Sequence, residues 1–135
     1  MEKIDLTTIT PILEKIFRKK KAVLFCYVFG SFAYQNFNSE SDVDIAVYMD
    51  KARVSDFFDE RLELISEISQ ALGKEADILV LNSTPPFLKY VVLKEGKLIF
   101  SRDESKRIDF ELKTTNEYFD FRFVLEKYNK RMMKL

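Results

Sequence analysis

The chain has 135 residues, of which 47% are hydrophobic and 33% are charged; this predicts one domain, residues 1–135, and is too short for two ordinary ones. Its 22 basic and 22 acidic residues balance, so no overall charge attracts the chain to nucleic acid or to a membrane surface. The absence of histidine excludes Ser-His-Asp and Cys-His catalysis, and also histidine-ligated zinc.

The first third of the chain predicts a helix and then a buried strand. Apolar residues between positions 9 and 17 recur at helical spacing, with Pro11 expected in the first turn. The apolar run 22–29 is short and rich in β-branched and aromatic residues, which is typical of a fully buried strand and too short for a membrane span. Its lone cysteine, Cys26, is expected to be a small buried hydrophobe, which suits a reducing cytoplasm.

The rest of the chain alternates between predicted strands and helices. A strand is expected at about 42–49, then a helix from Val54 to Leu72 that ends at Gly73. The segment "EADILVLN" predicts a third strand, "STPP" begins a short helix that Gly96 ends, and "KLIF" predicts a fourth strand. Ser101 and Glu104 predict a capping box for a long final helix, about 102–131. This order predicts an α/β (α+β) fold with a small mixed sheet flanked by helices.

Three aspartates lie on predicted strands where apolar residues would be expected. Side chains at i and i+2 of a strand point to the same face, so Asp42 and Asp44 project side by side, about 6–7 Å apart along the backbone. Two carboxylates this close raise each other's pKa unless a cation lies between them. If the strand that contains Asp77 neighbours theirs, the three side chains converge. Because any metal here must use oxygen ligands, the pattern predicts a cage for one or two Mg²⁺ ions.

A Gly-Ser pair follows the buried strand. Gly30 allows a sharp turn and a close approach of backbone N–H groups to an anion, and Ser31 can cap a short helix whose N-terminus favours phosphate. Each feature alone has an ordinary structural explanation, as a turn, a loop end or a strand end that faces water. Together with the carboxylates, the pair predicts a site for a metal–nucleotide complex.

The spacing resembles a known family signature. Gly30-Ser31, ten residues and then Asp42-Val43-Asp44 resemble the GS-x10-DxD motif of the DNA polymerase β-like nucleotidyltransferase superfamily. The stretch "EADILVLNSTPPFLKYVVLKEGKLIF" and the closing "NEYFDFRFVLEKY" are similar to the minimal nucleotidyltransferases, which are commonly the antitoxins of HEPN/MNT toxin–antitoxin pairs. The resemblance covers nearly the whole chain and implies the nucleotidyltransferase fold.

The resemblance also implies a reaction. Asp42 and Asp44 would hold two Mg²⁺ ions, with Mn²⁺ as an alternative, and Asp77 would bind the metal nearest the attacking hydroxyl and help to remove its proton. AMP would pass from ATP to a tyrosine of a HEPN ribonuclease toxin, and pyrophosphate would leave. The expected partner is therefore that toxin, in a hetero-oligomer, with no membrane and no direct nucleic-acid contact.

The resemblance assigns the phosphates of ATP to Gly30, Ser31 and Ser41, but it has one departure beside them. Family members often read "GSFARGE" where this chain has Tyr34-Gln35 in place of Arg-Gly. The lost positive charge would weaken triphosphate binding unless a nearby cation, such as Arg53, replaced it. Two alternatives stay open: a binding-only antitoxin with a degenerate site, and a small-molecule (aminoglycoside-type) adenylyltransferase, which would need a further substrate domain.

The aromatic residues of the final helix do not form one stripe. Positions 110, 121, 124, 125 and 128 make one apolar face, and positions 108, 112 and 119 make another. Such a helix is either deeply buried or buried twice, once on its own core and once on a partner. We interpret the helix as the partner-binding element, with a simple core role as the alternative.

Overall fold

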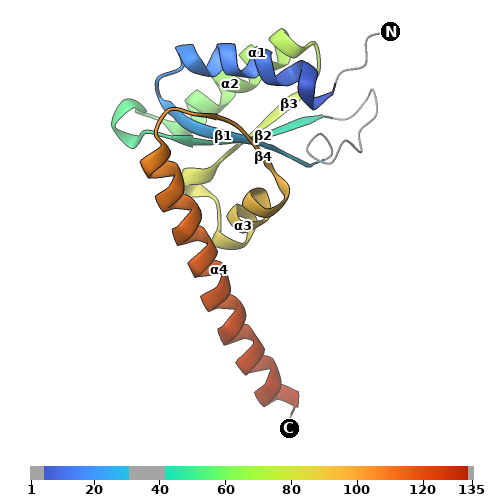
Figure 1. The fold of residues 1–135 in the computed structure, drawn as a ribbon, viewed down its shortest axis with the longest axis vertical. Helices are drawn as coiled ribbons and strands as arrows, with labels where there is room; N and C mark the ends of the chain where they lie inside the picture. Colours follow the sequence, from blue (N-terminus) through green and yellow to red (C-terminus); the bar gives the residue numbers. More distant parts are fainter. Residues whose placement is uncertain (1–4, 31–41, 134–135) are drawn as a thin grey trace.

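The computed structural model describes residues 5–30 and 42–133, in which four strands form one sheet with helices on both faces (Figure 1). The strand order is β3-β2-β1-β4, and the strands are β1 (Val23–Phe29), β2 (Val43–Met49), β3 (Ala76–Val80) and β4 (Lys97–Ser101). β1 runs antiparallel to β2 and β4, whereas β2 and β3 are parallel. The predicted mixed sheet and fold class are confirmed.

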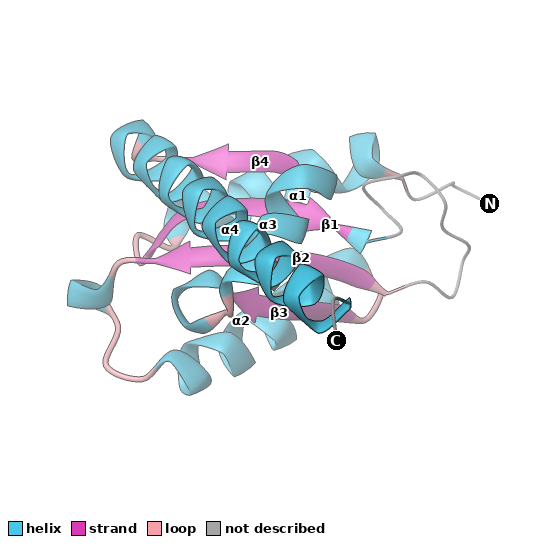
Figure 2. Ribbon diagram, turned by 90° about the horizontal axis from the view of Figure 1, so that it is seen from below, coloured by secondary structure: helices cyan, strands magenta, loops and turns pink. Residues whose placement is uncertain are grey.

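Two helices cover each face of the sheet (Figures 1 and 2). α1 (Leu6–Lys19) and α2 (Phe57–Leu72) pack on one face, where their buried side chains meet alternate residues of β2 and β3. α3 (Pro86–Glu95) and the first half of α4 (Glu104–Met133) lie on the other face. Cys26 is fully buried in the hydrophobic core between the sheet and the helices α1 and α2, as predicted. In the described part of the chain, no helix is both long and apolar enough to cross a membrane.

Two helix positions differ from the prediction. Pro11 is the sixth residue of α1 and lies beyond its first turn. The carbonyl four residues earlier belongs to Thr7, which is exposed, so water can satisfy it. α2 begins at Phe57 and not at Val54, because Asp56 caps it by accepting hydrogen bonds from two backbone N–H groups of the first turn, at 2.8 and 3.3 Å. The predicted end at Gly73 is confirmed, with φ +66°.

The end of β3 and the start of α4 also differ from the prediction. β3 stops at Val80, because the next residues form a short 3-10 helix, η3 (Leu81–Ser83). The Asn82 side chain in this helix accepts a hydrogen bond from the Met49 N–H at 2.9 Å and donates one to the Met49 carbonyl at 2.8 Å. α4 begins after Asp103, whose carboxylate accepts the Lys106 N–H at 3.1 Å. Ser101 does contact Glu104, at 2.9 Å, but it belongs to β4, so the predicted capping box does not begin the helix.

The first half of α4 is fixed to the sheet by polar and apolar contacts. The Tyr27 hydroxyl donates to Glu111 Oε1 at 2.7 Å, and Arg107 Nη1 donates to the same oxygen at 2.9 Å. Burial and this acidic partner raise the pKa of Tyr27. Phe110 packs against the ring of Phe25, with centroids 5.4 Å apart.

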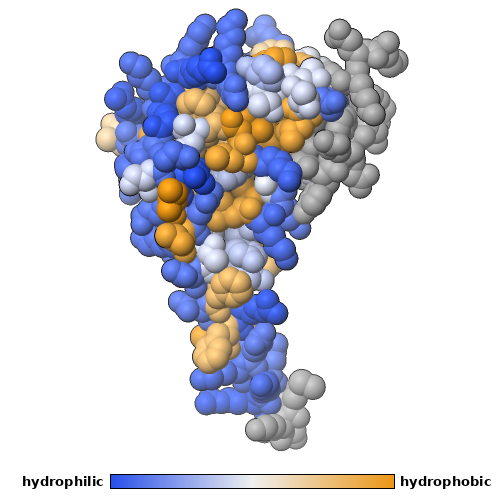
Figure 3. All heavy atoms as spheres, viewed as in Figure 1, coloured by the Kyte–Doolittle hydropathy of each residue, from blue (hydrophilic) through white to orange (hydrophobic). Residues whose placement is uncertain are grey.

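The second half of α4 projects away from the domain (Figure 1). The helix has 30 residues, a length of about 45 Å. Figure 3 shows apolar side chains between hydrophilic ones along this projection. We call residues 119–131 the outer half of α4; its large apolar side chains are 45–64% exposed, namely Phe119, Phe121, Phe123, Val124, Leu125 and Tyr128. Deep burial and a simple core role are therefore wrong for this part of the helix.

Candidate active site

The three predicted aspartates lie at one end of two neighbouring strands. Asp44, near the start of β2, is the register partner of Asp77, near the start of β3, and Asp42 lies one residue before β2. Register partners on adjacent strands point to the same face, here the face that α3 and α4 cover. The two strands are thus neighbours, which is the condition on which the expected convergence of the aspartates depends.

Gly30 lies directly against Asp44, at the end of β1. Its φ of +72° belongs to the left-handed region, which side chains other than glycine rarely adopt. A Cβ at this position would also lie 2.5 Å from Asp44 Oδ2. Conformation and proximity therefore both require glycine here. The other predicted phosphate ligands, Ser31 and Ser41, and the Tyr34-Gln35 departure lie outside the described residues.

The carboxylates create an environment that favours a cation. Asp44 is half-buried, and its pKa is raised, first by burial and then by the charges of Asp77 and Asp42. Oxygen donors with this mutual repulsion suit Mg²⁺ or Mn²⁺. Among the described residues, however, no three acidic side chains are gathered closely enough to bind one ion together. The predicted convergence of three carboxylates therefore stops short of a closed cage.

Asp77 is held by Arg61, a residue that the sequence analysis missed. Arg61 Nη2 donates to Asp77 Oδ1 at 2.8 Å, and its Nε donates to the carbonyl of Ile78 at 2.6 Å. Asp77 Oδ1 also accepts the Ile78 N–H at 2.9 Å. β3 is an edge strand, so the two side chains satisfy both backbone groups of Ile78 where a further strand would otherwise pair.

Arg53 cannot replace the missing basic residue, contrary to expectation. It lies in a short 3-10 helix, η2 (Lys51–Arg53), which follows the opposite end of β2 from Asp44. There it forms an ion pair with Asp50 at 3.7 Å. Within the described ranges, Arg61 is the cation in contact with one of the three predicted carboxylates.

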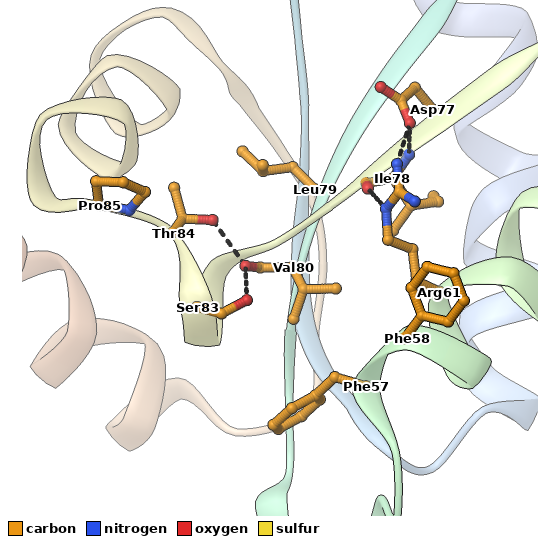
Figure 4. Close-up of a pocket in the computed structure, with 10 residues that line it drawn as sticks. All are labelled: Phe57, Phe58, Arg61, Asp77, Ile78, Leu79, Val80, Ser83, Thr84 and Pro85. Carbon is orange, nitrogen blue, oxygen red and sulfur yellow. Dashed lines mark hydrogen bonds and ion pairs between the residues drawn. The ribbon is translucent and has the colours of Figure 1, made fainter.

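Two hollows meet at Asp77. The first, which we call the acidic hollow, has a volume of about 570 Å³ and contains Asp42, Glu75 and Asp77 beside the middle of α2. The second, the aromatic hollow, has a volume of about 480 Å³ and lies between the start of α2 and the segment that follows β3 (Figure 4). Its walls include Phe57, Phe58, Arg61, Val80, Thr84 and Pro85. Asp77 therefore lines both a polar site and an apolar one.

Comparisons with known proteins identify the family to which this chain is similar. Residues 12–105 match the family described as "Polymerase beta, Nucleotidyltransferase". The "putative protein adenylyltransferase" of Methanocaldococcus jannaschii is 34% identical over 80 residues, which are 57% of this chain and 80% of that protein.

Two solved structures are similar over nearly the full length. A chain in the crystal structure of a toxin–antitoxin with AMP-PNP is 25% identical with a TM-score of 0.73, covering 92% of this chain and 98% of that one. A chain in the structure of tri-AMPylated Shewanella oneidensis HEPN toxin in complex with MNT antitoxin is 23% identical with a TM-score of 0.69, covering 94% and 98%.

Proposed function

The chain belongs to the polymerase beta nucleotidyltransferase family, and we propose that it is a Mg²⁺-dependent protein adenylyltransferase that modifies a tyrosine of a HEPN ribonuclease toxin and thereby acts as its antitoxin. The observation on which this rests is the placement of Asp44 opposite Asp77, with Gly30 against the Asp44 carboxylate. The adenylyltransferase name of the M. jannaschii relative and the AMPylated toxin in the similar complex support the reaction and the partner.

In the proposed reaction each acidic residue has a separate task. Asp42 and Asp44 hold the divalent cation, which when bound stabilises the negative charge on the transferring phosphoryl group. The backbone at Gly30, with Ser31 and Ser41, binds the phosphates of ATP. Asp77 orients the tyrosine hydroxyl and accepts its proton at Oδ2, because Oδ1 is engaged by Arg61 and Ile78. AMP is then transferred and pyrophosphate leaves.

A transfer assay tests this proposal. The purified protein, Mg²⁺ and α-labelled ATP are incubated with the product of the neighbouring reading frame, beside an Asp42→Ala/Asp44→Ala control. Label on the partner that the control does not produce is the expected result. If the control labels the partner as efficiently as wild type, the assignment of these two residues is wrong.

A second candidate is an antitoxin that neutralises its partner by contact alone. The exposed apolar side chains of the outer half of α4 favour it, because they offer a binding surface that needs no catalysis. In that case the Asp42→Ala/Asp44→Ala variant would protect cells from the toxin as well as wild type does. In both candidates the protein forms a hetero-oligomer with the toxin. We place it in the cytoplasm, where the buried, unpaired Cys26 would stay reduced.

A further inference from the structure

The roles proposed above for ATP and the cation leave the aromatic hollow beside Asp77 unassigned. We propose that it is the acceptor subsite, which receives the phenol side chain of a tyrosine from the partner protein and presents its hydroxyl to Asp77. This inference rests on the proposed adenylyltransferase activity and adds to it the place where the acceptor binds.

The position of Asp77 provides the first argument. This residue lines both hollows, so a side chain that fills the aromatic hollow reaches the same carboxylate that faces Asp42 across the acidic hollow. Figure 4 shows Arg61 and Asp77 together at one end of the aromatic hollow, with Pro85 at the other. A ligand that enters from the apolar part therefore meets a charged pair at the end of the hollow.

The walls provide the second argument, because they suit an aromatic ring. Phe57 and Phe58 from the start of α2 line the hollow together with Val80 and Pro85. The Phe58 side chain is 62% exposed at the hollow. Exposed aromatic side chains around a concave surface are typical of binding sites, and aromatic pairs gain about 0.5–1.5 kcal/mol beyond the burial of their area. An amphipathic phenol ring matches apolar walls that end in a polar group.

The edge of β3 excludes a different way of binding. An extended partner segment would add to the sheet by bonding the outward backbone groups of β3. The carbonyl of Ile78 already accepts from Arg61 Nε at 2.6 Å, and the carbonyl of Val80 accepts from Thr84 Oγ1 at 2.7 Å. Because these acceptors are satisfied, the hollow is suited to a side chain and not to a strand.

The chemistry provides the third argument. The chain has no histidine, and Asp77 is the one carboxylate among the described residues that line the aromatic hollow. We therefore assign the proton of the acceptor to this carboxylate, which is a weak base. A phenol, with a pKa of about 10, loses its proton far more readily than an aliphatic alcohol, and the Arg61 guanidinium at the end of the hollow stabilises the phenolate that forms. Tyrosine is thus a better acceptor here than serine or threonine.

The transfer step exchanges one bond at the phenol oxygen and one at the α-phosphorus. The phenol O–H bond breaks, and its proton passes to Asp77 Oδ2 and then to water. The phenol oxygen bonds to the α-phosphorus of ATP, while the bond from that phosphorus to the bridging oxygen breaks and pyrophosphate leaves. The products are O-adenylyl-tyrosine, pyrophosphate and one proton.

A matched pair of variants tests the subsite. Phe58→Ala removes a wall of the hollow, whereas Phe87→Ala removes an equally exposed phenylalanine from α3, outside the hollow (62% and 59% exposed). With N-acetyl-L-tyrosinamide as the acceptor probe, we expect Phe58→Ala to raise the acceptor KM at least fivefold and to leave the KM for ATP unchanged. Phe87→Ala should change neither. Equal acceptor KM values for the two variants would overturn the subsite while leaving the activity in place.

A binding measurement separates the subsite from the activity. Titration of the ¹⁵N-labelled protein with N-acetyl-L-tyrosinamide should shift the amide resonances of Phe58, Arg61 and Thr84, and N-acetyl-L-serinamide should shift them much less. These shifts in a protein that transfers no AMP would support the subsite and refute the proposed reaction. Shifts confined to other parts of the molecule, or equal shifts with serinamide, would refute the subsite.

Discussion

Replacement of Gly30 by alanine should separate stability from activity. An added Cβ would lie 2.5 Å from Asp44 Oδ2, a separation that must grow to at least 3.0 Å, so the carboxylate oxygen must move by at least 0.5 Å. Because the atom belongs to the free end of a side chain, this movement costs little stability. Displacing a reacting or metal-binding group by up to 1 Å costs on the order of 10- to 100-fold in rate. We therefore expect AMP transfer to fall by about that factor.

Gly73 provides the matched control. Its φ of +66° is close to the +72° of Gly30, but a Cβ at Gly73 would meet no atom within 4 Å. Both alanine variants should lose about 1–2 kcal/mol of unfolding free energy from the left-handed conformation, which lowers the melting temperature by about 3–10 °C in a domain of this size. Only Gly30→Ala should lose activity.

Thermal unfolding and the labelled-ATP assay, run on both variants, decide the matter. Equal losses of stability with unequal losses of activity would support the proposed contact between Gly30 and the catalytic carboxylate. If both variants kept wild-type activity at a temperature where both are folded, the position of Asp44 against Gly30 would have no catalytic meaning, and the reasoning would be refuted.

Asp44, Tyr27 and the outer half of α4 each give a further prediction. Burial and two neighbouring carboxylates raise the pKa of Asp44, so this carboxyl contributes stability to the metal-free protein that is lost as the pH rises above about 4. In urea denaturation with EDTA, the change in unfolding free energy from pH 4 to 7 should therefore be less favourable for wild type than for Asp44→Asn. Tyr27→Phe deletes the 2.7 Å hydrogen bond to Glu111 and should lower the unfolding free energy by about 1 kcal/mol in urea. Phe121→Ser/Phe123→Ser changes exposed side chains, so calorimetry should show at least about tenfold weaker toxin binding at an unchanged melting temperature.

The parts of the site that depend on local rules could be predicted from the sequence. The alternation of side chains on a strand predicts Asp42 and Asp44 on one face. The convergence with Asp77 is conditional on the pairing of β2 with β3, which the structure supplies and which puts Asp77 opposite Asp44. Helix termination by a left-handed glycine predicted the end of α2 at Gly73. These features need only neighbouring residues or neighbouring strands.

The parts that depend on long side chains could not be predicted. Arg61 extends from α2 to the edge of β3 and reaches Asp77, sixteen residues later in the chain. No spacing rule distinguishes it from the other charged residues of an amphipathic helix. Arg53 is close in sequence to Asp44, but β2 carries it to the opposite end of the sheet. The outer half of α4 has apolar residues on more than one face, and its exposure became evident only from its projection beyond the domain.

The Arg61–Asp77 pair connects the stability of the sheet with the chemistry of the proposed site. Through Oδ1 the Asp77 carboxylate helps to satisfy an edge strand, and no hydrogen bond from a described residue engages its Oδ2. The Arg61 side chain is 33% accessible and the Asp77 side chain 64% accessible, so solvent screens their ionic attraction, which contributes at most about 1 kcal/mol to folding. Fixing the orientation of one carboxylate oxygen has a much larger effect on the rate of a reaction than on the free energy of folding. The pair is therefore better explained as a positioning device that also closes a sheet edge than as a stabilising ion pair.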